Sequence, residues 1–284
     1  MADTQVSAHR PERLPRAEAE ICLSVDVEEW YEAPGRGLGE GGGNRPAGRL
    51  AASMPLVFDL LDDLGARATL FFLGTAARDH PDLVREAVRR GHEVACHGWS
   101  HTLVSAMEPV RFEEDLRRAR VLLQDLSGQA VIGFRAPRWS LDGAPWAYGA
   151  LERAGFTYSS SRLPIPGLGG GRRGPHSRGS VLEIPALVFP GKSMPVPAGG
   201  TLALRWLPTA WLRAARDDCL AQGRPAVYWF HPWEVDPESP RIRGAGGPFT
   251  LQRYAFLSRL PGRLSSLAGG GAVPLAEAAL RWRT

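Results

Sequence analysis

Short apolar segments that alternate with amphipathic segments constrain the fold of this chain most strongly. Residues 21–27 (ICLSVDV) and 68–73 (ATLFFL) are apolar with little alternation, as expected for strands buried on both faces. Residues 109–126 instead repeat apolar side chains at helical spacing, with Phe112 and Leu116 on one face. This rhythm predicts an α/β fold with a parallel sheet covered by helices, and both a doubly wound sheet and a (β/α) barrel fit it.

The same reading gives the order of elements. The predicted strands are residues 21–27, 68–73, 92–96, 131–134, 181–184 and 226–231. The predicted helices are residues 54–65, 81–90, 109–126, 145–155, 208–222 and 252–268, followed by a strand–helix unit from Ala272. Two glycine-rich segments, 35–46 and 167–179, are predicted loops. The alternation of predicted strands and helices continues across the segment at 167–179. We therefore expect a single domain at 20–284 after a disordered leader at 1–19.

The composition is that of a globular protein, with 44% hydrophobic and 23% charged residues. No apolar run approaches the roughly 20 residues that span a bilayer, and residues 1–20 lack the apolar centre of a secretory signal. Three widely spaced cysteines favour reduced thiols and a cytoplasmic location, with peripheral attachment to the inner membrane left open. The formal charge of +4 forms no basic stripe, so we expect no nucleic-acid partner.

Ionisable residues follow four of the predicted strands at the point where each strand ends. In parallel α/β proteins this edge of the sheet is where sites are built. Four strands with ionisable residues at their ends are more than a random distribution of such residues along the chain would produce. The residues are Asp26 and Glu28, His97 and His101, Arg135, and His231.

Four of these residues have the composition of a metal site. Asp26 and Glu28 lie two apart on a strand, so both point to one face, where a cation would relieve their repulsion. His97 and His101 lie four apart, which on a helical turn brings both imidazoles to one side. Two histidines and one carboxylate commonly bind catalytic zinc or another divalent ion. The alternative for each pair is a solvent-facing group without a metal.

The remaining polar residues have less specific signals. Arg135 could orient a carboxylate or hold an anion, and it could equally form a structural ion pair. His231 could act as a general acid or be a packed, hydrogen-bonded imidazole. Four tryptophans near these positions offer flat surfaces for sugar rings, although tryptophans also fill cores. They are Trp30, Trp99, Trp139 and Trp233.

Five motifs in order carry a resemblance to a known family. They are SVDVEEW at 24–30, HGWSH at 97–101, FRAPRWS at 134–140, GFTYSSS at 155–161 and FHPWEVDP at 230–237. Over residues 20–280 the chain resembles the polysaccharide deacetylase family (the NodB homology domain, carbohydrate esterase family 4). Within that family it is most similar to the bacterial branch linked to exopolysaccharide and exosortase gene clusters.

The resemblance implies a distorted (β/α) barrel with seven strands. It also implies a bound divalent ion, zinc in the first place or cobalt or another ion, and removal of N-acetyl groups from amino sugars. The implied partner is an N-acetylated glycan or a lipid-linked glycan precursor, and the oligomeric state stays open. Matched residue by residue, Asp26 is the general base, Glu28, His97 and His101 are the metal ligands, Arg135 positions the base, and His231 is the general acid.

Two departures from the family pattern affect these roles. Ser159 stands where resembling sequences often have Asp after the tyrosine of the fourth motif. Without that Asp, Arg135 could lose a partner and activity could be weaker, unless Glu183 substitutes. Glu28 replaces the commoner Asp and reaches one methylene further.

Two other functions remain open from the sequence. Some relatives hydrolyse cyclic amides of the allantoin type on a similar barrel, and a degenerate barrel could bind glycans without catalysis. The tryptophans and the HPWEVDP segment favour a glycan substrate over a cyclic amide. Retention of Asp26, both histidines, Arg135 and His231 argues against a purely binding role.

Overall fold

The computed structural model describes residues 20–32, 46–165, 171–189, 195–242, 246–268 and 271–283. The predicted leader at 1–19 and nearly all of the glycine-rich segment at 35–46 lie outside the described residues.

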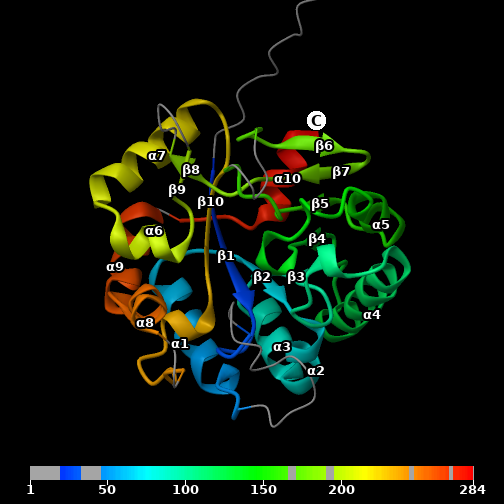
Figure 1. Cartoon of the computed structure of the whole chain (residues 1–284), viewed down its shortest axis with the longest axis horizontal. Coiled ribbons are helices and arrows are strands. Elements are labelled where there is room, and N and C mark those ends of the chain that lie inside the picture. Colours follow the sequence, from blue (N-terminus) through cyan, green and yellow to red (C-terminus); the bar gives the residue numbers. More distant parts are fainter. Residues whose placement is uncertain are drawn as a thin grey trace, which may run out of the picture.

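A curled, mostly parallel sheet forms the centre of the molecule (Figure 1). Its strand order is β10-β1-β2-β3-β4-β5-β7-β6, in which the first seven strands run parallel and β6 pairs antiparallel with β7. The predicted α/β fold with seven barrel strands is confirmed, and the sheet curls as a half-barrel. The strands are β1 (Ile21–Val27), β2 (Thr69–Phe72), β3 (Glu93–Cys96), β4 (Gly133–Phe134), β5 (Tyr158–Ser159), β6 (His176–Arg178), β7 (Val181–Glu183) and β10 (Ala226–Phe230).

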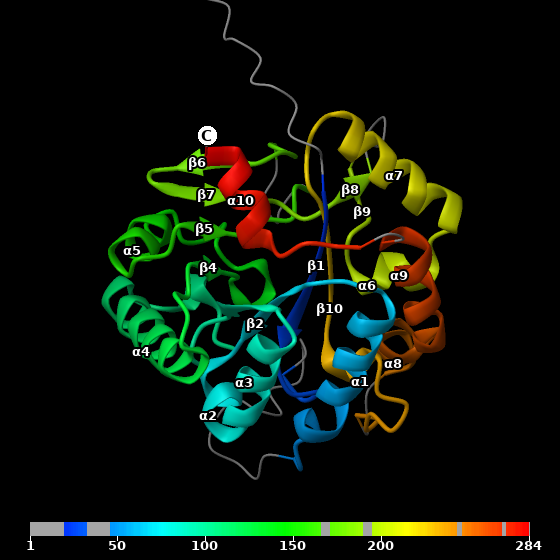
Figure 2. The ribbon, with the colours of Figure 1, turned by 180° about the vertical axis from the view of Figure 1, so that it is seen from behind.

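Helices surround this sheet, as Figures 1 and 2 show from opposite sides. They are α1 (Leu50–Asp63), α2 (Gly74–Asp79), α3 (Pro81–Arg89), α4 (Pro109–Ser127), α5 (Ala147–Arg153), α6 (Thr201–Trp206), α7 (Thr209–Ala221), α8 (Gly247–Tyr254), α9 (Leu260–Ala268) and α10 (Leu275–Arg283). All but one of these helices are outside the sheet, whereas α10 packs against inner-face side chains such as Cys22. Short 3-10 turns lie at η1 (Val104–Ala106), η2 (Pro137–Trp139), η3 (Pro232–Glu234) and η4 (Leu257–Arg259), and β8 (Val188–Phe189) pairs with β9 (Val196–Pro197).

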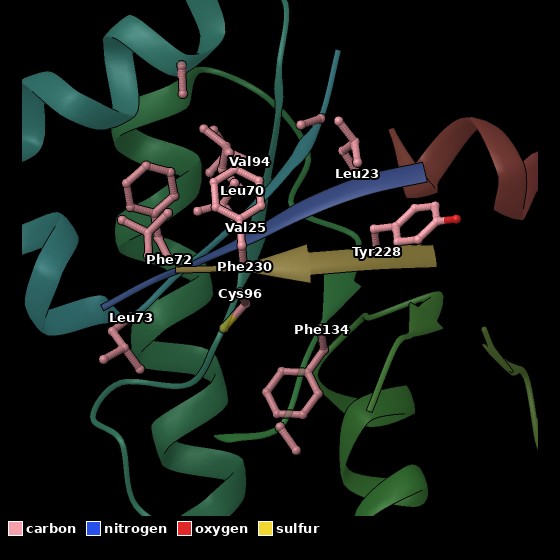
Figure 3. Packing of buried hydrophobic residues seen from close by; sticks show 14 of the residues in the cluster. Leu23, Val25, Leu70, Phe72, Leu73, Val94, Cys96, Phe134, Tyr228 and Phe230 are labelled. Carbon is pink, nitrogen blue, oxygen red and sulfur yellow. The ribbon is translucent and has the colours of Figure 1, made fainter. Parts of the chain in front are cut away.

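The pleat of β1 separates the two faces of the sheet. Leu23 and Val25 belong to the large apolar cluster between the sheet and its helices, together with side chains such as Phe72 and Phe230 (Figure 3). Because side chains alternate along a strand, the residues between them point to the concave interior. These are Cys22, Ser24 and Asp26, so the interior becomes polar toward the end of β1.

The start of α10 closes the half-barrel at the beginning of the strands. The Leu275 N–H donates to the hydroxyl of Thr69, and the Ala276 N–H donates to the carboxylate of Glu93. Thr69 and Glu93 are the first residues of β2 and β3. The strand predicted from Ala272 is reduced to one bridge, between Val273 and Cys22, because the chain turns directly into α10.

Two further sequence predictions are wrong in detail. Part of the predicted loop at 167–179 forms β6, which makes a hairpin with β7 around Gly179, whose positive φ of 64° suits the turn. The helix predicted at 252–268 is divided into α8, η4 and α9, because Phe256 adopts the left-handed conformation with φ of 60°. An α-helix cannot continue through a left-handed residue.

None of the helices in the described ranges is long and apolar enough to cross a membrane.

Helix α4 provides a test of the packing. Leu116 is fully buried against the sheet, whereas Val121 on the same helix is 55% exposed. We expect Leu116→Ala to lower the free energy of unfolding by about 2–5 kcal/mol, because it leaves a cavity. The matched control, Val121→Ala, should change it by less than about 0.5 kcal/mol. Denaturant unfolding measures both values, and equal effects would contradict this packing.

Candidate functional site

The ionisable residues singled out in the sequence meet at the carboxyl ends of the strands. Asp26 is near the end of β1 and Glu28 follows it, while His97 and Arg135 directly follow β3 and β4. His231 directly follows β10, which pairs with β1. All but His231 are buried. The parallel register therefore brings residues more than 200 positions apart in the chain to one edge.

Glu28, His97 and His101 form a compact cluster of metal-ligating groups. Oε2 of Glu28 lies 2.8 Å from Nε2 of His101 and 3.5 Å from Nε2 of His97. One ligand atom from each of the three residues lies within 4.8 Å of the others. The HGWSH segment forms bends, so the predicted helical turn is wrong, yet both imidazoles reach one point.

The electrostatics of this cluster fit a cation. Burial alone would raise the pKa of Glu28, but the positive charges of His101 and His231 outweigh it and hold that pKa well below its usual range. Burial opposes protonation of His101, yet the charge of Glu28 raises its pKa. Oε2 of Glu28 is buried and has no hydrogen bond of normal geometry to any described residue. An unsatisfied carboxylate oxygen facing two imidazole nitrogens is the donor set of a zinc-type ion.

The backbone of the HGWSH segment is held from two sides. The N–H groups of Gly74 and Thr75, at the start of α2, donate to the carbonyls of Gly98 and Trp99. On the other side, the carboxylate of Asp115 on α4 accepts the Trp99 N–H at 2.7 Å. Burial raises the pKa of Asp115 to about 6. These bonds fix the segment that carries both histidines.

Hydrogen bonds also fix the orientation of two imidazoles. Nδ1 of His97 lies 2.8 Å from the carbonyl oxygen of Arg135, so Nδ1 carries the proton and Nε2 faces Glu28. Nδ1 of His231 lies 2.8 Å from Oε2 of Glu234, and its Nε2 lies 3.8 Å from Oε1 of Glu28. Burial would lower the pKa of His231, but the carboxylate of Glu234 raises it to about 9. His231 therefore carries a proton at neutral pH.

Arg135 and Asp26 form an ion pair in the interior of the half-barrel. Arg135 is fully buried, and its NH1 donates to Oδ1 of Asp26 and to the hydroxyl of Ser24, each at 2.8 Å. Its Nε and NH2 donate to the carbonyl and the hydroxyl of Ser160. The guanidinium also lies 4.3 Å from the centre of the Phe71 ring. Arg135 thus has one carboxylate partner, supplemented by two serines.

This arrangement answers the question raised by Ser159. The Ser159 hydroxyl donates to the hydroxyl of Ser161, and the Arg135 guanidinium donates to Ser160 instead of Ser159. Glu183 does not substitute as a partner of Arg135, since its carboxylate accepts hydrogen bonds from the Ser161 N–H, the Arg162 N–H and the Tyr148 hydroxyl. The neighbouring Ser160 supplies the contacts on that side of the guanidinium instead.

Two of the four tryptophans lie beside the ionisable residues. The Trp233 ring stacks on the His231 imidazole with centroids 5.4 Å apart. The Trp139 ring lies 5.3 Å from the Arg135 guanidinium and meets Trp229 edge to face at 4.8 Å. Trp139 has a positive φ of 58°, a strained conformation for a non-glycine residue of the kind that gathers at functional sites.

The other two tryptophans have packing contacts that account for them. Trp30 is 8% exposed, and its indole N–H donates to the carbonyl of Ala47. The Arg118 guanidinium lies 3.4 Å over the Trp99 ring, which also lies directly against Gly74. These contacts account for the positions of both rings, and their role as surfaces for a sugar stays a prediction.

Sequence reasoning missed several residues that support the site. Ser24 could have been found, since it precedes Asp26 by two and so shares its face. Glu234 lies three residues after His231, and the structure shows that its carboxylate orients that imidazole. Asp115 and Ser160 gave no signal, because their roles depend on contacts 16 and 25 positions away.

Comparison with known families divides the chain into two matched regions. Residues 46–158 match the model of a family described as polysaccharide deacetylase. Residues 160–272 match the model of a family described as a domain of unknown function (DUF3473). The boundary falls at β5, inside one continuous sheet.

Individual relatives and structures extend this comparison. A peptidoglycan deacetylase-like protein of Gibberella zeae is 28% identical over 163 residues, covering 53% of this chain and 46% of that protein. The chain spans about half the length of the first relatives that it matches.

Solved structures support the fold. A Mycobacterium smegmatis protein assigned to the polysaccharide deacetylases superposes with a TM-score of 0.62 at 19% identity, over 98% of this chain and 95% of that one. An allantoinase gives the same TM-score of 0.62 at 16% identity, over 98% of this chain and 94% of that one. At these identities the likeness shows the fold alone.

The contact between Asp115 and Trp99 gives a testable prediction. We expect Asp115→Ala to weaken zinc binding about tenfold, because the segment that carries both histidines loses one of its supports. Asp125→Ala, an exposed position on the same helix, is the matched control and should leave the Kd unchanged. Calorimetric titration of the metal-free protein at pH 8 measures both values. An unchanged Kd for Asp115→Ala would show that the segment is held without it.

Proposed function

We propose that this chain, whose residues 46–158 match the model of the polysaccharide deacetylase family, is a metal-dependent hydrolase that removes N-acetyl groups from amino sugars. The substrate we propose is a bacterial polysaccharide or its lipid-linked precursor, with an exopolysaccharide as the first to test. The observation that carries the proposal is the meeting of three groups at one edge: the Asp26–Arg135 pair, the Glu28–His97–His101 cluster, and His231.

Asp26 is the group we assign to accept a proton from the attacking water. Its Oδ1 accepts a hydrogen bond from Arg135, which leaves the second oxygen of the carboxylate to take the proton. Because Arg135 is fully buried and held by Ser24 and Ser160, it fixes the direction in which Asp26 points. The water oxygen then forms the new bond to the acetyl carbon.

His231 is the group we assign to protonate the leaving nitrogen. The Glu234 carboxylate holds its Nδ1, so the proton on Nε2 faces the cluster. As the bond between the acetyl carbon and the nitrogen breaks, this proton passes to the nitrogen, and acetate and a free amine result. The carboxylate of Glu234 raises the pKa of His231, which favours the protonated form that this role requires.

Glu28, His97 and His101 would hold the divalent cation, and we propose zinc, with cobalt as a second candidate. When bound there, the cation supplies Lewis acidity, which lowers the pKa of a water ligand and polarises the acetyl carbonyl. Trp139 and Trp229 line the side of the site next to Arg135. We assign them to contact with the substrate.

Acetate release tests this function directly. We expect the zinc-loaded protein to release acetate from N-acetylglucosamine oligomers, to stop when a chelator removes the metal, and to recover when zinc is restored. Release that persists after the metal is removed would contradict the assigned mechanism. Hydrolysis of allantoin but not of the oligomers would indicate a cyclic amide as the substrate class in place of an N-acetylated glycan. Oligomer binding without acetate release, by protein shown to hold zinc, would indicate a non-catalytic glycan-binding protein.

Two variants separate metal binding from proton transfer. We expect His97→Ala to abolish both zinc binding and turnover, because it removes a ligand. Asp26→Asn should bind zinc normally and lower kcat by at least about 100-fold, because the amide cannot take the proton. His176→Ala, on the edge strand β6, is the control for loss of an imidazole and should change neither. Zinc binding is measured by titration and kcat by acetate release. Normal turnover of Asp26→Asn would remove Asp26 from the mechanism.

A further inference from the structure

We propose that the groove between α6 and α8 binds a hydrophobic chain that is joined to the amino-sugar substrate, such as the acyl or isoprenoid tail of a lipid-linked glycan. This inference rests on the proposed function, because it places the sugar at His231. The inference goes beyond the proposed function by naming where the tail of the substrate lies. It also assigns a role to part of the region matched by the domain of unknown function.

The groove is apolar and open. Its volume is about 470 Å³, and among the described residues that line it Gln252 alone is neither hydrophobic nor proline. Leu202 and Trp206 on α6 and Leu251 on α8 line it, and they are 44%, 41% and 56% exposed. Exposed apolar surface of this extent is unfavourable in water and marks a binding surface. Glycan hydroxyls would find almost no hydrogen-bond partners there, whereas a hydrocarbon chain needs none.

The groove adjoins a second cavity at His231, with which it shares two lining residues. This cavity of about 290 Å³ is lined by His231, Trp233 and Glu234, and it shares Leu202 and Gln252 with the groove. A ligand can therefore reach from the general acid to the apolar groove without leaving the surface. This continuity favours a tail attached to the substrate over an unrelated partner, since the two binding regions are joined.

A buried arginine lies at the junction. Arg253, which is 6% exposed, lines the second cavity with its guanidinium 3.8 Å from the Trp233 ring. Among the residues that the structure describes, no carboxylate forms an ion pair with it, and its hydrogen bonds go to the Trp30 carbonyl and the Tyr254 hydroxyl. The positive charge between the polar and apolar regions suits a phosphate, the group that commonly joins a sugar to a lipid.

The test compares two substrates that differ only in the chain. Octyl and methyl N-acetyl-β-glucosaminide, both below the micelle concentration, are offered to the zinc-loaded protein. We expect the Kd from calorimetry and the KM for acetate release to be at least about tenfold lower for the octyl compound, because burial of about two methylenes gives that factor. Equal values for the two compounds would overturn the proposal.

Variants then locate the chain. Leu251→Gln should raise the Kd and KM of the octyl compound toward those of the methyl compound and leave kcat unchanged. Leu280→Gln is the matched control, since Leu280 is 63% exposed on α10, away from the groove. An equal effect of Leu251→Gln on both compounds would overturn the assignment. The assignment would also be overturned if Leu251→Gln changed only the sedimentation of the protein with phosphatidylglycerol vesicles, or only its self-association. The groove would then serve a membrane or a second copy of the chain.

The readouts keep this inference separate from the proposed function. Tighter binding of the octyl compound that depends on Leu251, without acetate release, would support the groove and contradict the deacetylase. Acetate release from both compounds with equal KM values would support the deacetylase and contradict the groove.

Discussion

The buried charge of Arg135 is the constraint on which the rest of the site depends. A guanidinium without exposure to water must be paired and hydrogen-bonded, because an uncompensated buried charge costs several kcal/mol. Here the side chain begins after β4, meets Ser24 and Asp26 on β1, and meets Ser160 after β5. It thus crosses the concave side of the sheet. Arg135 therefore joins groups at the ends of β1, β4 and β5 and fixes the direction of Asp26.

Strand pairing then determines which groups can cooperate. Glu28 precedes the first matched region, His97 and His101 lie within it, and His231 lies in the region matched by the domain of unknown function. These residues meet only because β10 pairs with β1. The second region also contributes Glu234, which orients His231, and the apolar groove beside it. The two regions therefore build one site between them.

Much of this could be predicted from the sequence, because buried parallel strands and amphipathic helices leave strong periodic patterns. The strand at 21–27 and the ionisable residues at the strand ends follow from local pattern alone. What failed has a physical reason in each case. The left-handed Phe256 breaks a helix without a glycine or proline at that position, and β6 forms in a polar segment because β7 offers it a partner. The packing roles of Trp30 and Trp99 depend on Ala47 and Arg118, which no spacing rule connects to them.

The account depends on one divalent cation between Glu28, His97 and His101. Anomalous diffraction at the zinc edge, from crystals of the full chain grown with zinc, tests this most directly. We predict one strong peak about 2.0–2.2 Å from Nε2 of His97, Nε2 of His101 and a carboxylate oxygen of Glu28. A protein that shows these three side chains in the arrangement described, with no peak between them or with zinc bound only elsewhere, would contradict the account.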